Sequence, residues 1–242
     1  IIDAGSGLRR LGLEMAARQQ APQKIHLLLS HFHWDHIQGL PFFVPAYMPG
    51  NEIHVYTPQP SAEATIRRQM NPHNFPVDLD YMRGQWIFHQ MAAETAYEIA
   101  GYHLESRFNE HPGGAWSFSV QRDGRKVVYA SDCEYTDMTA ERLAGFVAFF
   151  QDAGALVFDA QYALDEAMGA KYQWGHSTAS VGLDLAARAG VKRLLCYHHD
   201  PVNSDQKLDE MLDTARYYQD NAWPPQARCA LIFAHDGLVV RL

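Results

Sequence analysis

The chain has 242 residues, of which 47% are hydrophobic and 20% are charged, a composition typical of a globular protein. A chain of this length buries a large apolar core without disulfides or structural metals, so we expect any metal site to serve chemistry. Lys and Arg, 20 in all, are outnumbered by 28 Asp and Glu, for a formal net charge of −8. Because the basic residues occur at most in pairs, we expect no surface track for extended RNA or DNA.

The three cysteines, Cys133, Cys196 and Cys229, are odd in number and lack the spacing of a metal site. This usage is typical of free thiols in a reducing compartment. The longest apolar runs fall far short of the roughly 18 residues that span a membrane. We therefore expect a cytoplasmic protein with no membrane partner. Residues 1–5 read as the end of a buried strand with no methionine before it, so we also expect that the numbered chain begins inside a longer protein.

Apolar and alternating runs predict the strands, and capping residues mark the helix ends. Strands are predicted at 25–29, 53–56, 116–120, 126–130, 155–158 and 193–197. Helices are predicted at about 6–20, 61–70, 139–153, 177–190 and 205–219. Strands that alternate with helices in the second half, after a hairpin in the middle, favour an α/β fold of sheets covered by helices. We expect one domain over residues 1–242, with an insertion rich in Pro and aromatic residues at about 41–91.

The residues with the clearest chemistry come directly after the predicted strand at 25–29. They form the sequence His31-Phe32-His33-Trp34-Asp35-His36. In extended backbone the side chains of His31, His33 and Asp35 lie on one side, and a bend into a helix brings His36 to the same place. Imidazole and carboxylate groups suit Zn²⁺, Mn²⁺ and iron. The density of these groups predicts a metal site rather than a polar loop.

This loop resembles the signature of the metallo-β-lactamase superfamily, and further motifs of that superfamily follow in the expected order. Asp3 ends a strand, His111 precedes Pro-Gly-Gly, Asp132 follows a strand, and His198 ends the last motif. The resemblance covers almost the whole chain. It implies an αββα sandwich, without its first N-terminal strands in the numbered chain, and a hydrolase that uses metal ions.

The resemblance also implies a site with two divalent ions, with Zn²⁺ as the first choice and Mn²⁺ or iron as alternatives. His31, His33 and His111 would hold one ion. Asp35, His36 and His198 would hold the other, and Asp132 would bridge the two. Asp3 would support the metal loop without touching the metal.

The adjacent residues His198 and His199 leave an alternative open, since either could be the ligand. In extended backbone their side chains point in opposite directions, so only one of them faces the site. The matching motif of tRNA-processing nucleases has a single histidine that aligns with His198. We therefore prefer His198, and we expect His199 beside the ligands or facing the substrate.

Residues 175–179, with the sequence Gly-His-Ser-Thr-Ala, are similar to the phosphodiesterase branch of the superfamily. That branch includes tRNA 3′-processing nucleases and cyclic phosphodiesterases. There the histidine donates a proton or stabilises the phosphate, oriented by an acid on the preceding strand. His176 and Asp159 are the matching residues here, although His176 also has a plainer interpretation as the cap of the following helix. Asp35 is a further catalytic candidate, as the acceptor of a proton from the attacking water.

The resemblance therefore predicts hydrolysis of a phosphodiester, with a water activated by the metal ions as the nucleophile. A small or cyclic substrate is favoured. An RNA-processing nuclease is the first alternative. The negative net charge and the lack of a Gly- and Pro-rich arm that binds tRNA argue against it. A non-catalytic metal-binding sensory module is the second alternative. The complete set of metal ligands argues against it. A homodimer is compatible with the sequence.

Overall fold

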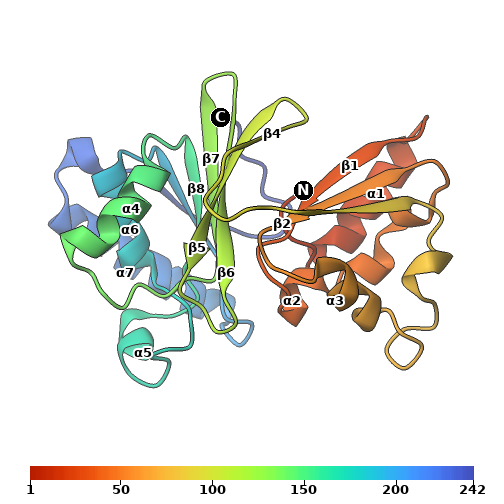
Figure 1. The fold of residues 1–242 in the computed structure, drawn as a ribbon. Helices are drawn as coiled ribbons and strands as arrows, with labels where there is room; N and C mark the ends of the chain where they lie inside the picture. The colour runs from red at the N-terminus through yellow and green to blue at the C-terminus, as the bar shows by residue number, and fades with distance from the viewer. The chain divides into compact units, whose positions relative to one another are not determined.

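The computed structural model describes residues 1–242, which form two compact units, Ile1–Ala92 (unit 1) and Ala93–Leu242 (unit 2). Each unit contains one β-sheet with helices packed on a face of it (Figure 1). None of the helices combines the length and the apolar composition that a membrane span requires.

Unit 1 is built on a parallel sheet in the order β1-β2-β3. Its elements are α1 (Gly7–Arg18), β1 (Lys24–Leu28), α2 (Trp34–Ile37), β2 (Glu52–Thr57), α3 (Ala62–Gln69) and β3 (Gln85–Gln90). Short 3-10 segments lie at Leu40–Phe42, Val44–Tyr47 and Leu79–Tyr81. Residues 41–91, which the sequence suggests as an insertion, supply β2, α3 and the unpredicted strand β3.

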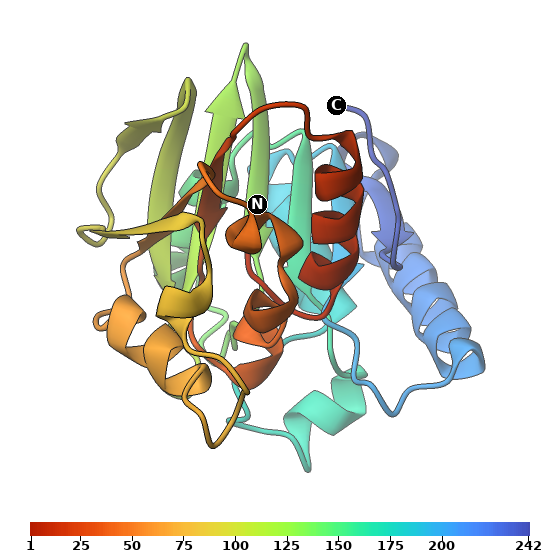
Figure 2. The same cartoon turned by 90° about the vertical axis from the view of Figure 1, so that its right-hand side faces the viewer.

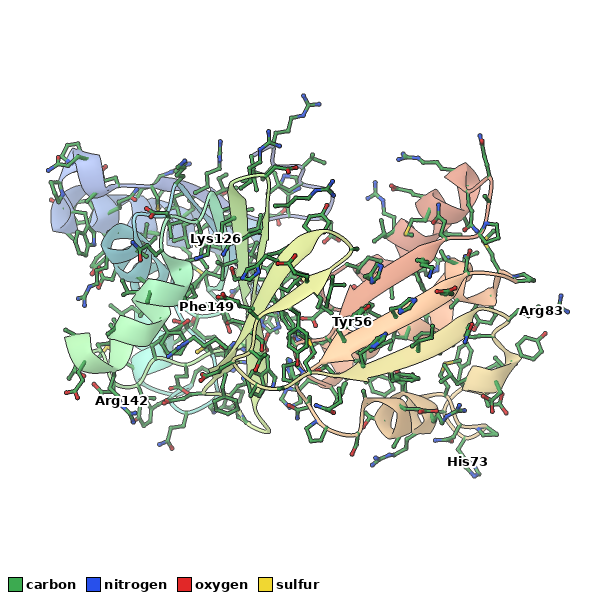
Figure 3. The ribbon with its side chains drawn as sticks, turned by 45° about the horizontal axis from the view of Figure 1, so that its top comes forward. Tyr56, His73, Arg83, Lys126, Arg142 and Phe149 are labelled. Atoms are coloured by element: carbon green, nitrogen blue, oxygen red, sulfur yellow. The ribbon has the colours of Figure 1, made fainter.

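The two faces of the unit 1 sheet differ because side chains alternate along each strand. On one face Ile25, Leu27, Ile53 and Val55 are buried against residues of all three helices, including Leu8 of α1 (Figure 2, red helix). The other face carries a row of stacked rings from the three strands. The ring centroids of His54 and His89 are 5.3 Å apart, and those of His89 and Tyr56 (labelled in Figure 3) are 4.4 Å apart.

Unit 2 is built on a seven-stranded sheet in the order β10-β9-β8-β7-β6-β5-β4. Its strands are β4 (Tyr97–Ile99), β5 (Tyr102–Asn109), β6 (Ala115–Arg122), β7 (Arg125–Ala130), β8 (Ala155–Asp159), β9 (Arg193–Tyr197) and β10 (Ala230–Phe233). Its helices are α4 (Ala140–Phe150), α5 (Leu164–Met168), α6 (Ala179–Ala189) and α7 (Asp205–Ala222), with a 3-10 segment at Pro225–Ala227. Strands β4 to β7 are antiparallel and β7 to β10 are parallel.

This topology brings the carboxyl ends of five strands, β5, β7, β8, β9 and β10, to one edge of the sheet. The parallel strands β7, β8 and β9 end there together, and β5 runs in the same direction because two antiparallel pairings separate it from β7. Ligands of α/β sheets commonly bind at such an edge. The segments that follow β5, β7 and β9 carry His111, Asp132 and His198, and Asp159 is the last residue of β8.

Helix α6 packs closely on β8 at the centre of the unit 2 core. Leu183 and Ala186 of α6 are buried with Leu156 and Phe158 of β8. A Cβ atom at Gly182 of α6 would lie 2.7 Å from the Phe158 ring, so only glycine permits this approach. The close packing fixes the start of α6, and with it His176, relative to the end of β8.

In unit 1 the start of the chain packs, through two glycines, against the segment that begins with the predicted metal loop, residues 31–36. The amide of Ala4 donates to the carbonyl of His36, and the amide of Gly39 donates to the carbonyl of Ala4, both at 2.8 Å. A Cβ atom at Gly39 would lie 2.1 Å from the carbonyl oxygen of Gly5, and one at Gly5 would lie 2.4 Å from the carbonyl oxygen of Asp35. These neighbours are backbone atoms, which cannot turn aside as a side chain can.

We therefore predict that Gly39→Ala lowers the free energy of unfolding by about 1–3 kcal/mol, the usual cost of overpacking. Gly7→Ala is the matched control, because a Cβ at this position in α1 meets no atom within 4 Å. The control should be neutral or stabilising by less than about 1 kcal/mol, since Ala favours a helix over Gly. Urea unfolding of the two variants measures the difference. Equal midpoints would show that the close approach of the two loops is not a constraint.

Candidate metal centre

In unit 1 the carboxylate of Asp3 holds the metal loop from behind. It accepts hydrogen bonds from the backbone amide of Ser30, the hydroxyl of Ser30 and Nδ1 of His36, each at 2.7 Å. Asp3 and His36 are both largely buried. Because an ionised carboxylate only accepts, the proton of His36 lies on Nδ1, and Nε2 is the nitrogen suited to a metal.

Ser30 extends this arrangement from Asp3 to His31. The single hydroxyl proton of Ser30 is donated to Asp3, so the hydroxyl oxygen must accept from Nδ1 of His31, 3.0 Å away. His31 therefore also carries its proton on Nδ1. Sequence reasoning did not assign Ser30 to the site, although its position between the strand and the first histidine was a signal.

The four predicted ligands of the metal loop lie together in unit 1. The ring of His31 lies 4.5 Å from that of His33 and 4.2 Å from that of His36, measured between centroids. Nε2 of His36 is 3.2 Å from a carboxylate oxygen of Asp35. His31 and His36 are buried, whereas His33 and Asp35 are exposed on the loop and on α2.

In unit 2 the buried carboxylate of Asp132 is the centre of a second cluster. Its Oδ1 atom is 3.7 Å from Nε2 of His111, 3.6 Å from Nε2 of His198 and 3.9 Å from Nδ1 of His176. Asp159 joins this group, and donor atoms of Asp132, Asp159, His176 and His198 all lie within 4.8 Å of one another. Every site residue predicted in this unit except His199 thus belongs to one cluster.

The backbone of Asp132 is left-handed, with φ of +57°, and several hydrogen bonds hold it there. Its amide donates to a carboxylate oxygen of Asp159 at 3.1 Å. The hydroxyl of Ser131 donates to the Asp132 carboxylate at 2.5 Å. The side-chain amide of buried Asn109 donates to the backbone carbonyl of Ser131 at 2.9 Å. Left-handed backbone is strained for residues other than glycine and persists where the surroundings fix it.

His176 is oriented by Asp159, as the sequence led us to expect for a catalytic pair. Its Nδ1 atom lies 2.8 Å from the carboxylate of Asp159, which is fully buried. A metal bound through the same two atoms would have to displace this hydrogen bond, so His176 is better placed as an oriented imidazole than as a ligand. The N-cap of α6 is Thr178, whose side chain accepts from the amide of Val181, so His176 does not cap the helix.

The adjacent histidines at the end of β9 lie in different surroundings. His198 faces the Asp132 cluster, and its Nδ1 atom is 3.1 Å from the side-chain amide of Gln161. His199 stacks on Phe233 of β10 at 5.0 Å, and burial lowers its pKa. The turn between them comes from left-handed backbone at His198, with φ of +60°, rather than from the alternation of an extended strand.

The cysteines offer no thiolate ligand to this cluster. Cys133, next to Asp132, is fully buried, and burial raises its pKa to about 12. Burial also raises the pKa values of Cys196 and Cys229. All three are free thiols, which stay protonated at neutral pH and are poor ligands in that form.

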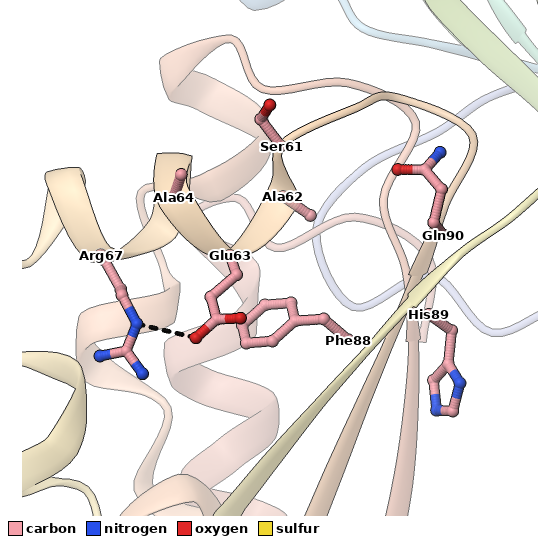
Figure 4. Close-up of a pocket in the computed structure, with 8 residues that line it drawn as sticks. All are labelled: Ser61, Ala62, Glu63, Ala64, Arg67, Phe88, His89 and Gln90. Carbon is pink, nitrogen blue, oxygen red and sulfur yellow. Dashed lines mark hydrogen bonds and ion pairs between the residues drawn. The ribbon is translucent and has the colours of Figure 1, made fainter.

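Two cavities lie apart from the predicted site residues. One of about 430 Å³ in unit 1 is lined by α3 and β3, with an ion pair of 2.9 Å between Glu63 and Arg67 (Figure 4). The other, of about 520 Å³, lies in unit 2 between α5, α6 and α7. Tyr162 at its rim packs edge-on against His176, with ring centroids 5.7 Å apart. Neither cavity contains a cluster of histidine and carboxylate groups.

Comparison with known proteins assigns the family. A model described as a beta-lactamase superfamily domain matches residues 1–199. The chain belongs to the metallo-β-lactamase superfamily. A ribonuclease Z from Nostoc sp. is 34% identical to it over 266 residues, which cover 89% of this chain and 80% of that protein. The chain is accordingly a metal-dependent hydrolase of this superfamily.

Solved structures confirm the predicted metallo-β-lactamase fold. The metallo-β-lactamase fold protein YhfI from Bacillus subtilis matches with a TM-score of 0.71 at 17% identity, over 98% of this chain and 84% of that one. A diphosphatase from the PhnP family matches with a TM-score of 0.66 at 17% identity, over 100% of this chain and 79% of that one. At these identities the likeness concerns the fold alone.

The different surroundings of His198 and His199 allow a test of which of the two binds metal. We predict that His198→Ala lowers the metal content of protein reloaded with Zn²⁺, because a ligand is lost. His199→Ala should keep the metal, because its ring packs on Phe233 away from Asp132. Elemental analysis of both variants makes the comparison, and each variant is the control for the other. Loss of metal in His199→Ala with retention in His198→Ala would make His199 the ligand.

Proposed function

We propose that the protein is a dinuclear metal-dependent phosphodiesterase that acts on a small or cyclic phosphodiester. The observation that carries the proposal is the hydrogen bond of 2.8 Å between His176 and the buried carboxylate of Asp159, beside Asp132. This pair supplies an imidazole with its Nδ1 proton held in place, which suits a group that must meet a phosphate oxygen through Nε2.

The residues present fit a pair of divalent ions. In the proposed site His31, His33 and His111 would hold one ion, Asp35, His36 and His198 would hold the other, and Asp132 would serve both. The order of the motifs along the chain supports this assignment. Support also comes from the hydrogen bonds at Nδ1 of His31, His36 and His111, which favour Nε2 as the metal-binding nitrogen of each. Imidazole and carboxylate ligands without thiolates suit Zn²⁺ first, with Mn²⁺ or iron as alternatives.

Bound divalent ions would lower the pKa of a coordinated water and neutralise charge on a phosphoryl oxygen. The remaining steps fall to side chains of the protein. Asp35, exposed on α2, accepts the proton of the attacking water. His176, when it carries a proton on both nitrogens, stabilises the phosphate in the transition state or donates its Nε2 proton to the leaving oxygen, and Asp159 stabilises the positive charge that the ring carries before the transfer.

Tyr162 closes one side of the His176 ring. Burial raises its pKa to about 12, so it stays a neutral phenol at physiological pH. A neutral phenol adds no charge beside the His176 imidazole. It also excludes water from that side of the imidazole, which strengthens the hydrogen bond to Asp159.

The substrate class rests on charge and on the relatives. A net charge of −8 with basic residues at most in pairs favours a small anionic substrate over a long polyanion. The relatives named ribonuclease Z favour an RNA substrate instead, so a nuclease acting on RNA is the second candidate.

A metal analysis joined to a substrate panel tests the proposed function. We predict that protein purified without chelator and refilled with Zn²⁺ or Mn²⁺ approaches two ions per chain. Asp132→Ala should lose more than one ion, because a bridging carboxylate serves both. The loaded protein should hydrolyse cyclic or small phosphodiesters faster than a precursor tRNA. The reverse preference would favour the nuclease, and a wild-type protein that binds no metal would contradict both.

His176 separates the roles of acid and electrostatic stabiliser. We predict that His176→Ala keeps its metal and its thermal stability but lowers kcat by about 10²- to 10⁴-fold, the usual range for a positioned acid or base. For a proton donor the loss should be smaller with a nitrophenolate leaving group, which needs little protonation, than with an alkoxide. Equal losses would make His176 a stabiliser of phosphate charge. Unchanged kcat with both substrates would remove it from the catalytic machinery.

A further inference from the structure

The carboxylate of Glu134 holds the loop that precedes His176 by two hydrogen bonds. One oxygen accepts from the amide of Gln173 at 2.8 Å, and the other accepts from the amide of Gly175 at 3.0 Å. Gln173 has left-handed backbone, with φ of +65°, which is strained for this residue and needs such support. Both carboxylate oxygens are engaged with backbone, so Glu134 is not oriented as a metal ligand.

The same loop contacts His111 through Gly175. The carbonyl oxygen of Gly175 lies 2.8 Å from Nδ1 of His111, and because a carbonyl only accepts, the proton of His111 lies on Nδ1. Nε2 is thereby turned toward the carboxylate of Asp132, 3.7 Å away. A Cβ at Gly175 would lie 2.4 Å from Nδ1 of His111 and 2.3 Å from Pro112, so the loop and the ring fit tightly.

Glu134 is itself fixed close to the cluster. It follows Asp132 by two residues, and its amide donates to the carbonyl of Glu110 at 2.9 Å, next to His111. A short chain of hydrogen bonds thus runs from the segment of Asp132 through Glu134 and Gly175 to the His111 ring. No other side chain accepts a hydrogen bond from the backbone amide of Gln173 or of Gly175.

We propose that Glu134 is a positioning residue for His111, which it orients through the backbone of residues 173–175. The inference rests on the proposed function, in which His111 is a metal ligand. The hydrogen bond to Nδ1 selects the tautomer of a ligating histidine, fixes its ring and raises its basicity, and losing such a partner typically lowers metal affinity about 10- to 100-fold. Since Glu134 acts one step further away, we expect a loss of about tenfold, at the lower end of that range.

The test compares Glu134→Gln with Glu110→Gln in the full chain. Glu134→Gln keeps the shape of the side chain but leaves one backbone amide facing an NH₂ group. Glu110→Gln removes the same charge beside His111, yet the side chain of Glu110 accepts only from the Thr136 hydroxyl, at 3.3 Å. Titration with Zn²⁺ against a chelator should give about tenfold weaker binding for Glu134→Gln and unchanged binding for the control. The visible spectrum of Co²⁺-loaded protein should change in Glu134→Gln alone.

A second variant and a measurement on metal-free protein separate the positioning role of Glu134 from the proposed function. Glu134→Asp keeps the charge but is too short to reach both amides, so it should also weaken binding. In metal-free protein labelled with ¹⁵N-histidine, the Nδ1 proton of His111 should exchange faster with water in Glu134→Gln than in wild type. Wild-type affinity and exchange in Glu134→Gln, or equal losses in both Gln variants, would overturn the inference. A wild type with the protected Nδ1 proton but no metal binding would instead overturn the proposed function.

Discussion

In each cluster of candidate ligands two of the three histidines are held by the same interaction, a hydrogen bond from Nδ1 to a buried oxygen. In unit 1 the oxygen belongs to Asp3 for His36 and to Ser30 for His31. In unit 2 it belongs to Asp159 for His176 and to the carbonyl of Gly175 for His111. An imidazole held in this way keeps one tautomer and one orientation, so its second nitrogen presents a defined lone pair or proton. What distinguishes a ligand from a catalytic imidazole is then the neighbour of Nε2, not the way the ring is held.

The hydrogen bonds act on backbone that the strand ends have already bent sharply. Asp132 follows strand β7, His198 follows strand β9 and Asp3 follows the isolated bridge residue Ile2, with positive φ of +57°, +60° and +55°. Such a residue reverses the direction of its side chain within one position, which an extended strand cannot do. The strain is of the order of 1–3 kcal/mol at each place, and the buried hydrogen bonds around Asp132 offset it. Function here determines local backbone that the residue types alone would disfavour.

These features explain what the sequence could and could not predict. The metal loop, the strand before it and the helix after Ser177 are local, since each depends on residues within a few positions, and all were predicted. Strand β5 was missed because its sequence Tyr-His-Leu-Glu-Ser-Arg-Phe-Asn is mostly polar, although its partner β6 is the next strand along the chain. The roles of Ser30, Glu134 and Gln161 were missed because their partners lie 27 to 41 residues away along the chain. His198 was preferred because the matching nuclease motif has a single histidine at that position, and alternation was used only to separate it from His199. In the structure the left-handed turn, not alternation, gives His198 its direction, since Cys196 two residues before it points into the apolar core.

The burial of Asp132 and Asp159 supports the proposed binding of a cation at this edge of unit 2. Both carboxylates are at most 2% exposed, and an amide of one donates to the other. Burying two anions side by side costs several kcal/mol per ion unless positive charge or strong donors compensate. Ser131, Gln161 and His176 supply donors to these groups, yet Oδ1 of Asp132 faces three imidazoles whose donation depends on their protonation. A divalent ion would compensate that carboxylate at every pH at which the histidines are neutral, so metal binding and the order of the surrounding loops should be thermodynamically coupled.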